Sequence, residues 1–207
     1  MDISITVDWW LFVINLVSKK RFKILETILE KNDFTQYGLK KELKIGMSIV
    51  NDTINILLDK EFIKKQEKNY VLINEKDLLE MIAFLKPLKR DLLFQINTAL
   101  TKKEVQAKLP KEVIYCLESA LEQYTNYYES NRVACYLPKK SLAKVNKEFF
   151  APGNKTMLIV LGDNPPLTKE EIRTKKQLKF TNSTRTIIDL YCDNKAFLAD
   201  KIIGKVK

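Results

Sequence analysis

Apolar residues in the first half of the chain recur every three or four positions, which is the spacing of amphipathic helices. The pattern predicts three helices, over residues 19–31, 35–43 and 49–60. Thr35 and Ser48 are the expected N-caps of the second and third helices, because their hydroxyl oxygens can accept hydrogen bonds from the free amides of a first helical turn. A tight turn at residues 44–47 joins these two helices, and together they are expected to form a helix-turn-helix unit.

Directly after the third helix the pattern changes to short strand-like runs. Residues 62–65 and 70–73 have this character, and the polar residues 66–69 separate them. Such a pair of runs predicts a β-hairpin, with Asn69 as the residue that tolerates a positive φ in its turn. A helix, a helix-turn-helix unit and a lysine-bearing hairpin within about 55 residues follow the order of a winged helix-turn-helix domain.

The second half alternates between helical and strand-like patterns. Helices are expected over residues 75–85, 88–100, 113–124 and 142–150, and strands over residues 132–137, 157–161 and 178–181. Thr101 and Glu104 have the spacing of a capping box, and Ser183 or Thr184 is the expected cap of a last helix. The expected fold class is therefore α+β. It consists of a winged helix-turn-helix domain at residues 19–86, followed by a C-terminal mixed α/β domain at residues 87–207.

Residues 1–18 form a hydrophobic N-terminal segment, in which residues 9–17 are apolar almost all round. This stretch is shorter than the roughly 20 apolar residues that span a bilayer, and acidic residues precede it where a signal peptide carries positive charge. We therefore expect a cytoplasmic protein without a membrane partner. Two roles for the stretch stay open, which are packing within the chain and formation of a homodimer.

Composition and charge narrow the classes of function. Lys and Arg number 36 against 26 Asp and Glu, so the net charge is +10 and favours a polyanionic partner such as nucleic acid. The absence of histidine removes His-based acid–base chemistry and mixed Cys/His metal sites. Cys116, Cys135 and Cys192 are far apart in the sequence and are expected to be buried thiols. We expect no catalysis, no cofactor and no bound metal.

The residues expected to contact double-stranded DNA lie on the third predicted helix and on both sides of it. Asn51 and Asn55 are one turn apart, and an asparagine amide can pair with adenine in the major groove. Ser48, at the helix start, is expected to contact a phosphate or a base edge. The lysines expected to bind phosphates are Lys40, Lys41, Lys44, Lys64, Lys65 and Lys68. Asp52 and Asp59 oppose the interpretation that this helix contacts DNA, because a carboxylate repels phosphate.

Several motifs together resemble a known family. They are the N-terminal winged helix, the helix and strand at residues 118–137 before Pro138, the Gly153-Asn154 turn before the strand at residues 157–161, and Thr181-x-x-x-Arg185-Thr186-Ile187-Ile188-Asp189. This combination resembles the AbiEi-like antitoxins of type IV toxin–antitoxin systems, which carry a winged-helix DNA-binding domain and a C-terminal antitoxin domain. The resemblance implies repression of the protein's own operon and a nucleotidyltransferase-like toxin as genetic partner. It assigns Arg185, Thr186 and Asp189 to the antitoxin domain.

The predicted function is thus a sequence-specific, homodimeric transcriptional regulator that binds double-stranded DNA. Two alternatives belong to other classes. In the first, the winged helix is a scaffold for protein interaction, with no specific DNA binding. In the second, the C-terminal domain acts on nucleotides and depends on Asp163 or Asp189. The absence of histidine and of a glycine-rich phosphate loop opposes the second alternative.

Overall fold

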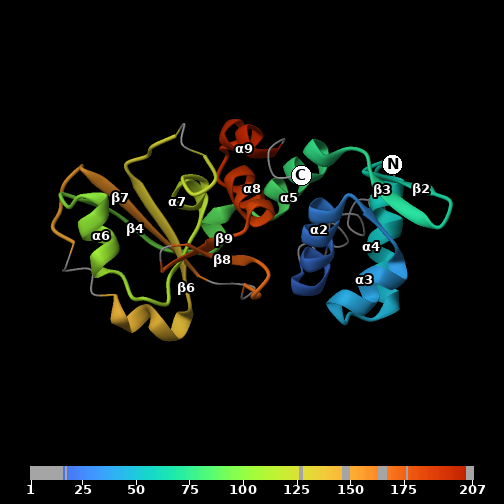
Figure 1. The fold of residues 1–207 in the computed structure, drawn as a ribbon, viewed down its shortest axis with the longest axis horizontal. Coiled ribbons are helices and arrows are strands. Elements are labelled where there is room, and N and C mark those ends of the chain that lie inside the picture. Colours follow the sequence, from blue (N-terminus) through green and yellow to red (C-terminus); the bar gives the residue numbers. More distant parts are fainter. Residues whose placement is uncertain are drawn as a thin grey trace, which may run out of the picture. The chain divides into compact units, whose positions relative to one another are not determined.

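The computed structural model describes residues 16, 18–125, 128–145, 150–162, 167–175 and 177–203. The chain divides into two compact units, Met1–Lys86 and Pro87–Lys207. Both units combine helices with a β-sheet (Figure 1), so the expected mixed α and β class is confirmed. The apolar stretch at residues 9–17 lies outside the described residues except for Leu16. Within the described part of the chain, no helix has the length and apolar character needed to cross a membrane.

The first unit contains four helices and a small antiparallel sheet among its described residues. In chain order its elements are α2 (Lys19–Lys31), β1 (Asp33–Phe34), α3 (Gln36–Leu43), α4 (Met47–Asp59), β2 (Ile63–Gln66), β3 (Asn69–Leu72) and α5 (Glu75–Leu85). The strand order is β1-β3-β2, so the β2–β3 hairpin is extended by a strand that precedes α3. The four helices and the hairpin were predicted, whereas β1 was not.

Two local predictions in this unit were wrong. The third helix begins at Met47 with Gly46 as its N-cap, so Ser48 lies inside the first turn and does not cap it. Asn69 is a strand residue that pairs with Gln66, and the positive φ of the hairpin turn, 51°, falls on Glu67. Helix α4 therefore begins two residues earlier than expected, and each strand of the hairpin is displaced by one residue toward the turn.

The interior of the first unit is built from the apolar faces of its helices. Phe22, Ile28, Ile54 and Leu78 are fully buried and come from α2, α4 and α5. Leu16 is also buried, and it packs with Ile56, Leu85 and Met81 of α4 and α5. Phe34 of β1 stacks on Tyr70 of β3, with ring centroids 5.9 Å apart, which ties the short strand to the hairpin.

The second unit is organised around a six-stranded mixed sheet of order β4-β7-β6-β5-β9-β8. Its elements are η1 (Leu88–Arg90), β4 (Leu92–Thr98), α6 (Lys102–Lys108), β5 (Ile114–Tyr115), α7 (Leu117–Leu121), β6 (Arg132–Leu137), η2 (Lys139–Lys144), β7 (Thr156–Gly162), β8 (Ile172–Lys175), β9 (Leu178–Thr181), α8 (Ser183–Cys192) and α9 (Ala196–Ile203). The neighbouring pairs β6–β7 and β5–β9 are parallel, and the other pairs are antiparallel. The β8–β9 hairpin forms one edge of the sheet (Figure 1).

Several predictions for this unit need correction. Residues 92–98 form strand β4 rather than part of a helix, because their backbone pairs with β7 while Phe94 enters the core. The predicted helix at residues 113–124 contains strand β5 and then the short helix α7. Residues 139–144 form a 3-10 helix, and residues 146–149 lie outside the described part of the chain. Strands β6, β7 and β9 were predicted, and β8 was not.

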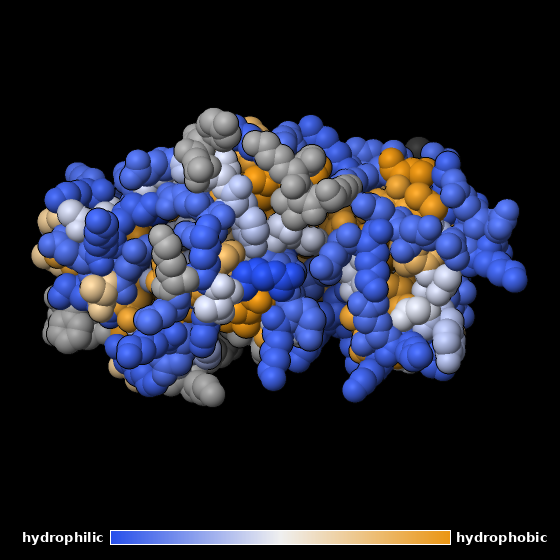
Figure 2. Space-filling model, in the orientation of Figure 1, coloured by the Kyte–Doolittle hydropathy of each residue, from blue (hydrophilic) through white to orange (hydrophobic). Residues whose placement is uncertain are grey.

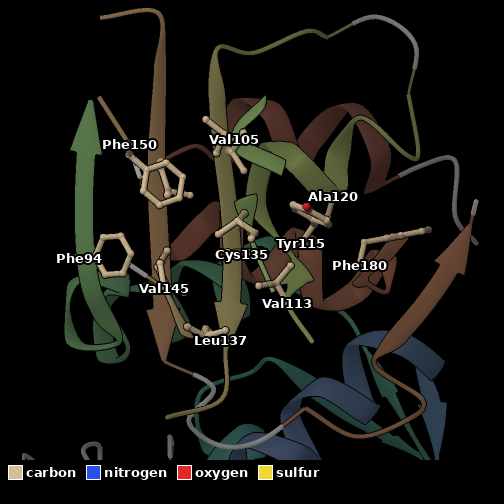
Figure 3. Close-up of a cluster of buried hydrophobic side chains, with 14 residues drawn as sticks. Phe94, Val105, Val113, Tyr115, Ala120, Cys135, Leu137, Val145, Phe150 and Phe180 are labelled. Carbon is tan, nitrogen blue, oxygen red and sulfur yellow. The ribbon is translucent and has the colours of Figure 1, made fainter. Parts of the chain in front are cut away.

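A continuous apolar cluster packs on one side of the central strands. Its residues come from strands β4, β5, β6, β7 and β9 and from α6 and α7, so distant parts of the sequence converge there (Figure 3). Val133, Cys135 and Leu137 alternate along β6 and are all fully buried in this cluster. Their period of two places one face of β6 against the cluster. The strand at the centre of the sheet is therefore anchored on that face by apolar packing.

Candidate nucleic-acid interface

The α3–turn–α4 unit is fixed by a side-chain cap and by one left-handed residue. The hydroxyl oxygen of Thr35 accepts a hydrogen bond of 2.9 Å from the backbone amide of Gly38, which confirms the predicted cap of α3. Lys44 ends α3 with φ 53° and ψ 40°, in the left-handed region. Gly46 has an ordinary φ of −60°, and open space surrounds the position where a Cβ would lie. Lys44, rather than the glycine, therefore supplies the unusual backbone geometry of the turn.

The exposed face of α4 presents mainly short polar side chains. Ser48 and Asn55 are exposed, while Val50, Ile54 and Leu57 are buried on the opposite face. Asn51 is only partly exposed, and its Oδ1 atom is covered and has no hydrogen-bond partner among the described residues. A bidentate contact with adenine needs both the oxygen and the nitrogen of the amide. Of the two predicted asparagines, Asn55 is thus the one placed for such a contact.

The two carboxylates of α4 lie in different electrostatic surroundings. Asp52 is exposed, and one of its oxygens is 3.5 Å from a guanidinium nitrogen of Arg21, a largely buried residue of α2. Asp59 is exposed at the last position of α4 and has no ion pair among the described residues. Repulsion of phosphate is therefore strongest at the C-terminal end of α4. The first two turns, from Ser48 to Asn55, are the part suited to approach a nucleic acid.

The six predicted lysines are all exposed. Lys40 and Lys41 lie in the last turn of α3 and Lys44 follows it, so these three are on the element before α4. No ion pair involving any of the six is present among the described residues. The described carboxylates of the same unit therefore do not neutralise these charges, which can attract an anionic partner.

The lysines of the β2–β3 hairpin do not share one face. Lys64 lies opposite Val71 and Lys65 opposite Tyr70, and successive residues of a strand point to opposite faces. Lys68 lies in the turn next to Glu67. The free end of the hairpin is hydrophilic (Figure 2). A partner bound to one face of the hairpin can therefore contact Lys68 and one of the two strand lysines, either Lys64 or Lys65, more readily than all three.

The predicted antitoxin residues lie inside the second unit. Arg185, Thr186 and Asp189 are at most 2% exposed, so they present no surface to a partner. The N-cap of α8 is Asn182, whose side-chain oxygen accepts a hydrogen bond of 2.8 Å from the amide of Arg185. The prediction of Ser183 or Thr184 as cap was wrong by one or two positions, because the helix already begins at Ser183.

Arg185 is the centre of a buried polar network. Its Nε atom donates at 2.9 Å to Oδ1 of Asp189, which lies one helical turn further along α8. The Tyr136 hydroxyl donates to the same carboxylate oxygen at 2.8 Å, and a guanidinium nitrogen of Arg185 lies 3.1 Å from the Tyr136 oxygen. A second guanidinium nitrogen donates to Glu171 at 3.4 Å. Burial raises the pKa of Tyr136, so its hydroxyl stays protonated and remains a donor.

Glu118 is the centre of a second polar cluster, which the sequence pattern did not indicate. It is 1% exposed, and it accepts from Arg132 at 2.6 Å and from Lys195. Asp193 accepts from the same Arg132 nitrogen at 3.0 Å and lies 2.8 Å from Lys195. The four charges come from α7, β6 and the α8–α9 connection, so only the folded chain brings them together. In the sequence, the one sign of this cluster is Glu118 itself, a carboxylate within a mainly apolar run.

The remaining candidates for chemistry are inaccessible or lie outside the described residues. Cys116, Cys135 and Cys192 are buried and unoxidised, as predicted. Burial raises the pKa of Cys116 and brings that of Cys135 to about 12. Asp163 lies outside the described residues. Within the described ranges, no group of three acidic, cysteine or histidine side chains is placed to hold a metal ion.

Tyr124 packs against the apolar core of the second unit. Its ring packs edge-on against Phe180, with centroids 5.7 Å apart, and its hydroxyl donates to the Thr181 carbonyl oxygen at 2.8 Å. Tyr127 lies outside the described residues.

No protein-family model, curated protein or solved structure matches this chain.

Proposed function

We propose that the chain is a sequence-specific regulator that binds double-stranded DNA through its first unit. The observation that carries the proposal is the element order of this unit, which is helix, strand, helix, helix and hairpin. Exposed polar residues lie on α4, and on either side of it are lysines that form no ion pair with any described residue. This is the order of a winged helix-turn-helix domain, in which the second helix of the helix-turn-helix enters the major groove. Here that helix is α4 and the wing is the β2–β3 hairpin.

In this proposal the residues have distinct roles. Asn55 reads a base edge, and Ser48, at the start of α4, contacts a base or a phosphate. Lys40, Lys41 and Lys44 hold the backbone on one side, while Lys65 and Lys68 hold it on the wing side. Arg21 supports the approach of DNA because it offsets the negative charge of Asp52.

We extend the proposal to autorepression and an antitoxin role on the basis of the resemblance to AbiEi-like proteins. Homodimers match two-fold symmetric operators, and repression of a protein's own operon needs such a site upstream of its gene. Arg185, Thr186 and Asp189 contribute to this role by holding the second unit together, because their side chains are buried. A surface that faces a nucleotidyltransferase-like toxin is formed by other residues of that unit.

The experiment that tests DNA reading is fluorescence anisotropy of the full chain. It compares a duplex from upstream of the gene with a scrambled duplex of equal length, at about 50 and 200 mM salt. We expect the upstream duplex to bind more tightly at both salt concentrations. Equal, weak binding of both duplexes would overturn the proposal and favour a protein-interaction module.

Two substitutions separate base reading from phosphate binding. Asn55→Ala is expected to weaken binding of the upstream duplex by about 1 to 3 kcal/mol and to leave the scrambled duplex almost unchanged. Lys65→Ala is expected to weaken both duplexes equally. Asn97→Ala, at an exposed position of β4 in the other unit, is the matched control and is expected to change neither. Equal losses on both duplexes for Asn55→Ala would remove Asn55 from the reading face.

A further inference from the structure

The positive charge of the chain is distributed very unevenly between the two units. Residues 1–86 contain fourteen Lys and Arg against thirteen Asp and Glu, whereas residues 87–207 contain twenty-two against thirteen. Of the net charge of +10, the first unit therefore carries +1 and the second unit +9. A nearly neutral unit gains little from long-range attraction to a polyanion, whereas a unit of +9 gains a great deal.

At least five cations of the second unit are already engaged with its own carboxylates. The engaged pairs or clusters are Arg185 with Asp189 and Glu171, Arg132 and Lys195 with Glu118 and Asp193, Lys102 with Glu122, and Lys144 with Glu112. The three cations Arg132, Arg185 and Lys195 stabilise the interior and are not available to a partner. The charge that can act outward must come from other residues.

The β8–β9 hairpin concentrates cations at an open edge of the sheet. Arg173, Lys175 and Lys179 are exposed on it, and Lys169 is exposed just before β8. No ion pair involving any of these four is present among the described residues. Glu171 is the buried partner of Arg185, and the exposed carboxylates near the four cations include Glu170 and also Glu112, which interacts electrostatically with Lys179.

The geometry of the hairpin holds these charges apart and in place. Arg173 and Lys175 lie two residues apart on β8, on one face and separated by about 6.6 Å of strand, whereas Lys179 pairs with Thr174 and lies on the opposite face. The Arg173 guanidinium donates to the carbonyl oxygen of Glu170 at 2.8 Å, which keeps it at the start of the strand. Glu171 joins the hairpin to α8 through Arg185, and its backbone oxygen accepts from the amide of Asn182 at 2.7 Å. The cations therefore lie on a hairpin that Glu171 attaches to α8.

We propose that the β8–β9 hairpin is a second DNA-contacting element, in which Arg173 and Lys175 on one face and Lys179 on the other bind phosphates of the backbone without reading sequence. This inference rests on the proposed function in one respect, because the partner is the same duplex that the first unit reads. It also assigns a purpose to the buried Arg185 network, which positions the hairpin. Exposed cations on an edge strand can alternatively serve to block pairing with a second sheet edge, and the test distinguishes the two roles.

The test measures how the dissociation constant of the full chain depends on salt. One variant carries Arg173→Gln, Lys175→Gln and Lys179→Gln. The control carries Lys103→Gln, Lys111→Gln and Lys155→Gln, at three exposed positions of the same unit, and has the same net charge. Each lost phosphate contact lowers the slope of log affinity against log salt by about 0.9. If all three charges bind phosphates, the loss of affinity between about 50 and 200 mM salt shrinks by roughly 40-fold.

We expect the hairpin variant to show this smaller slope on the upstream and the scrambled duplex alike, with an unchanged ratio between the two. Equal slopes for the hairpin variant and the control would overturn the inference. Equal slopes together with self-association of the hairpin variant on size-exclusion chromatography would assign the cations to protection of the sheet edge. If the wild-type chain binds both duplexes equally, the proposed function fails, yet the two slopes still decide the hairpin's role. If it binds neither duplex, both proposals fail.

Discussion

Arg185 has to remain ionised in an interior where a lone charge is very unfavourable. The structure meets this requirement by giving its guanidinium two carboxylates, Asp189 and Glu171, and the Tyr136 oxygen. A buried ion pair contributes little net stability when it is complete, because desolvation offsets the attraction, but loss of one partner leaves an uncompensated charge. The short Arg-Thr-x-x-Asp motif is thus explained by the interior of the second unit.

The first prediction at this scale concerns Arg185→Met. We expect it to lower the free energy of unfolding of the second unit by about 3 to 5 kcal/mol, because Asp189 stays buried without its cation. Urea unfolding followed by tyrosine fluorescence measures the change. Arg173→Met, on the exposed edge strand, is the control, and we expect an effect within about 0.5 kcal/mol. A loss below about 1 kcal/mol for Arg185→Met would contradict a central structural role for the network.

A second prediction concerns the reactivity of the three thiols. Cys116, Cys135 and Cys192 are at most 6% exposed, and burial raises the pKa of Cys135 to about 12. Thiolate is the reactive form, and at pH 8 a thiol with that pKa is almost wholly protonated. We therefore expect no reaction with a thiol-specific reagent in the native state and reaction of all three in denaturant. Rapid labelling of the native chain would show that the second unit opens readily.

At the scale of elements, the sequence was most informative where an element is long and amphipathic. Helix α5 has the predicted bounds, because its apolar residues follow the 3.6-residue period. Strand β1 has two residues, too few to show any period, and it exists because β3 offers a free edge. Strand β4 was mistaken for a helix, because pairing with β7 outweighs a local helical spacing.

In the candidate site, the exposed face of α4 was predictable, but the covered oxygen of Asn51 was not, because its surroundings form only on folding.

The capping box of α6 provides a prediction at the element scale. The side chain and amide of Thr101 both donate to Glu104, and these hydrogen bonds hold the pKa of that carboxyl below its usual range. A lowered pKa means that the stabilising contribution is present above the pKa of the unfolded chain and is lost as the pH falls through the folded value. We expect Thr101→Val to raise the Glu104 pKa in an NMR titration and Thr101→Ser to preserve it. An unchanged pKa in Thr101→Val would contradict the role of the side-chain hydroxyl.

At the scale of the whole molecule, the two units differ in charge, and each contains an apolar cluster of its own among the described residues. The main apolar cluster of the second unit contains residues 94–180 only, and the cluster around Leu16 contains residues of the first unit only. The first unit presents the candidate reading helix with a net charge of +1, whereas the second unit carries +9. In protein–DNA recognition, base contacts supply specificity, and phosphate contacts supply much of the affinity. The charge distribution therefore favours a division of these two tasks between the units.

Separate expression of residues 1–86 and 87–207 tests this division. Because each core is formed within one unit, we expect both fragments to show the dispersed amide spectra of folded proteins. The first fragment is expected to prefer the upstream duplex and to bind it more weakly than the full chain, because it lacks the phosphate contacts of the β8–β9 hairpin. The second is expected to bind the upstream and scrambled duplexes equally, with a steep dependence on salt. A second fragment that binds neither duplex at about 50 mM salt would show that its nine excess positive charges do not engage DNA, and that the first unit supplies both specificity and affinity.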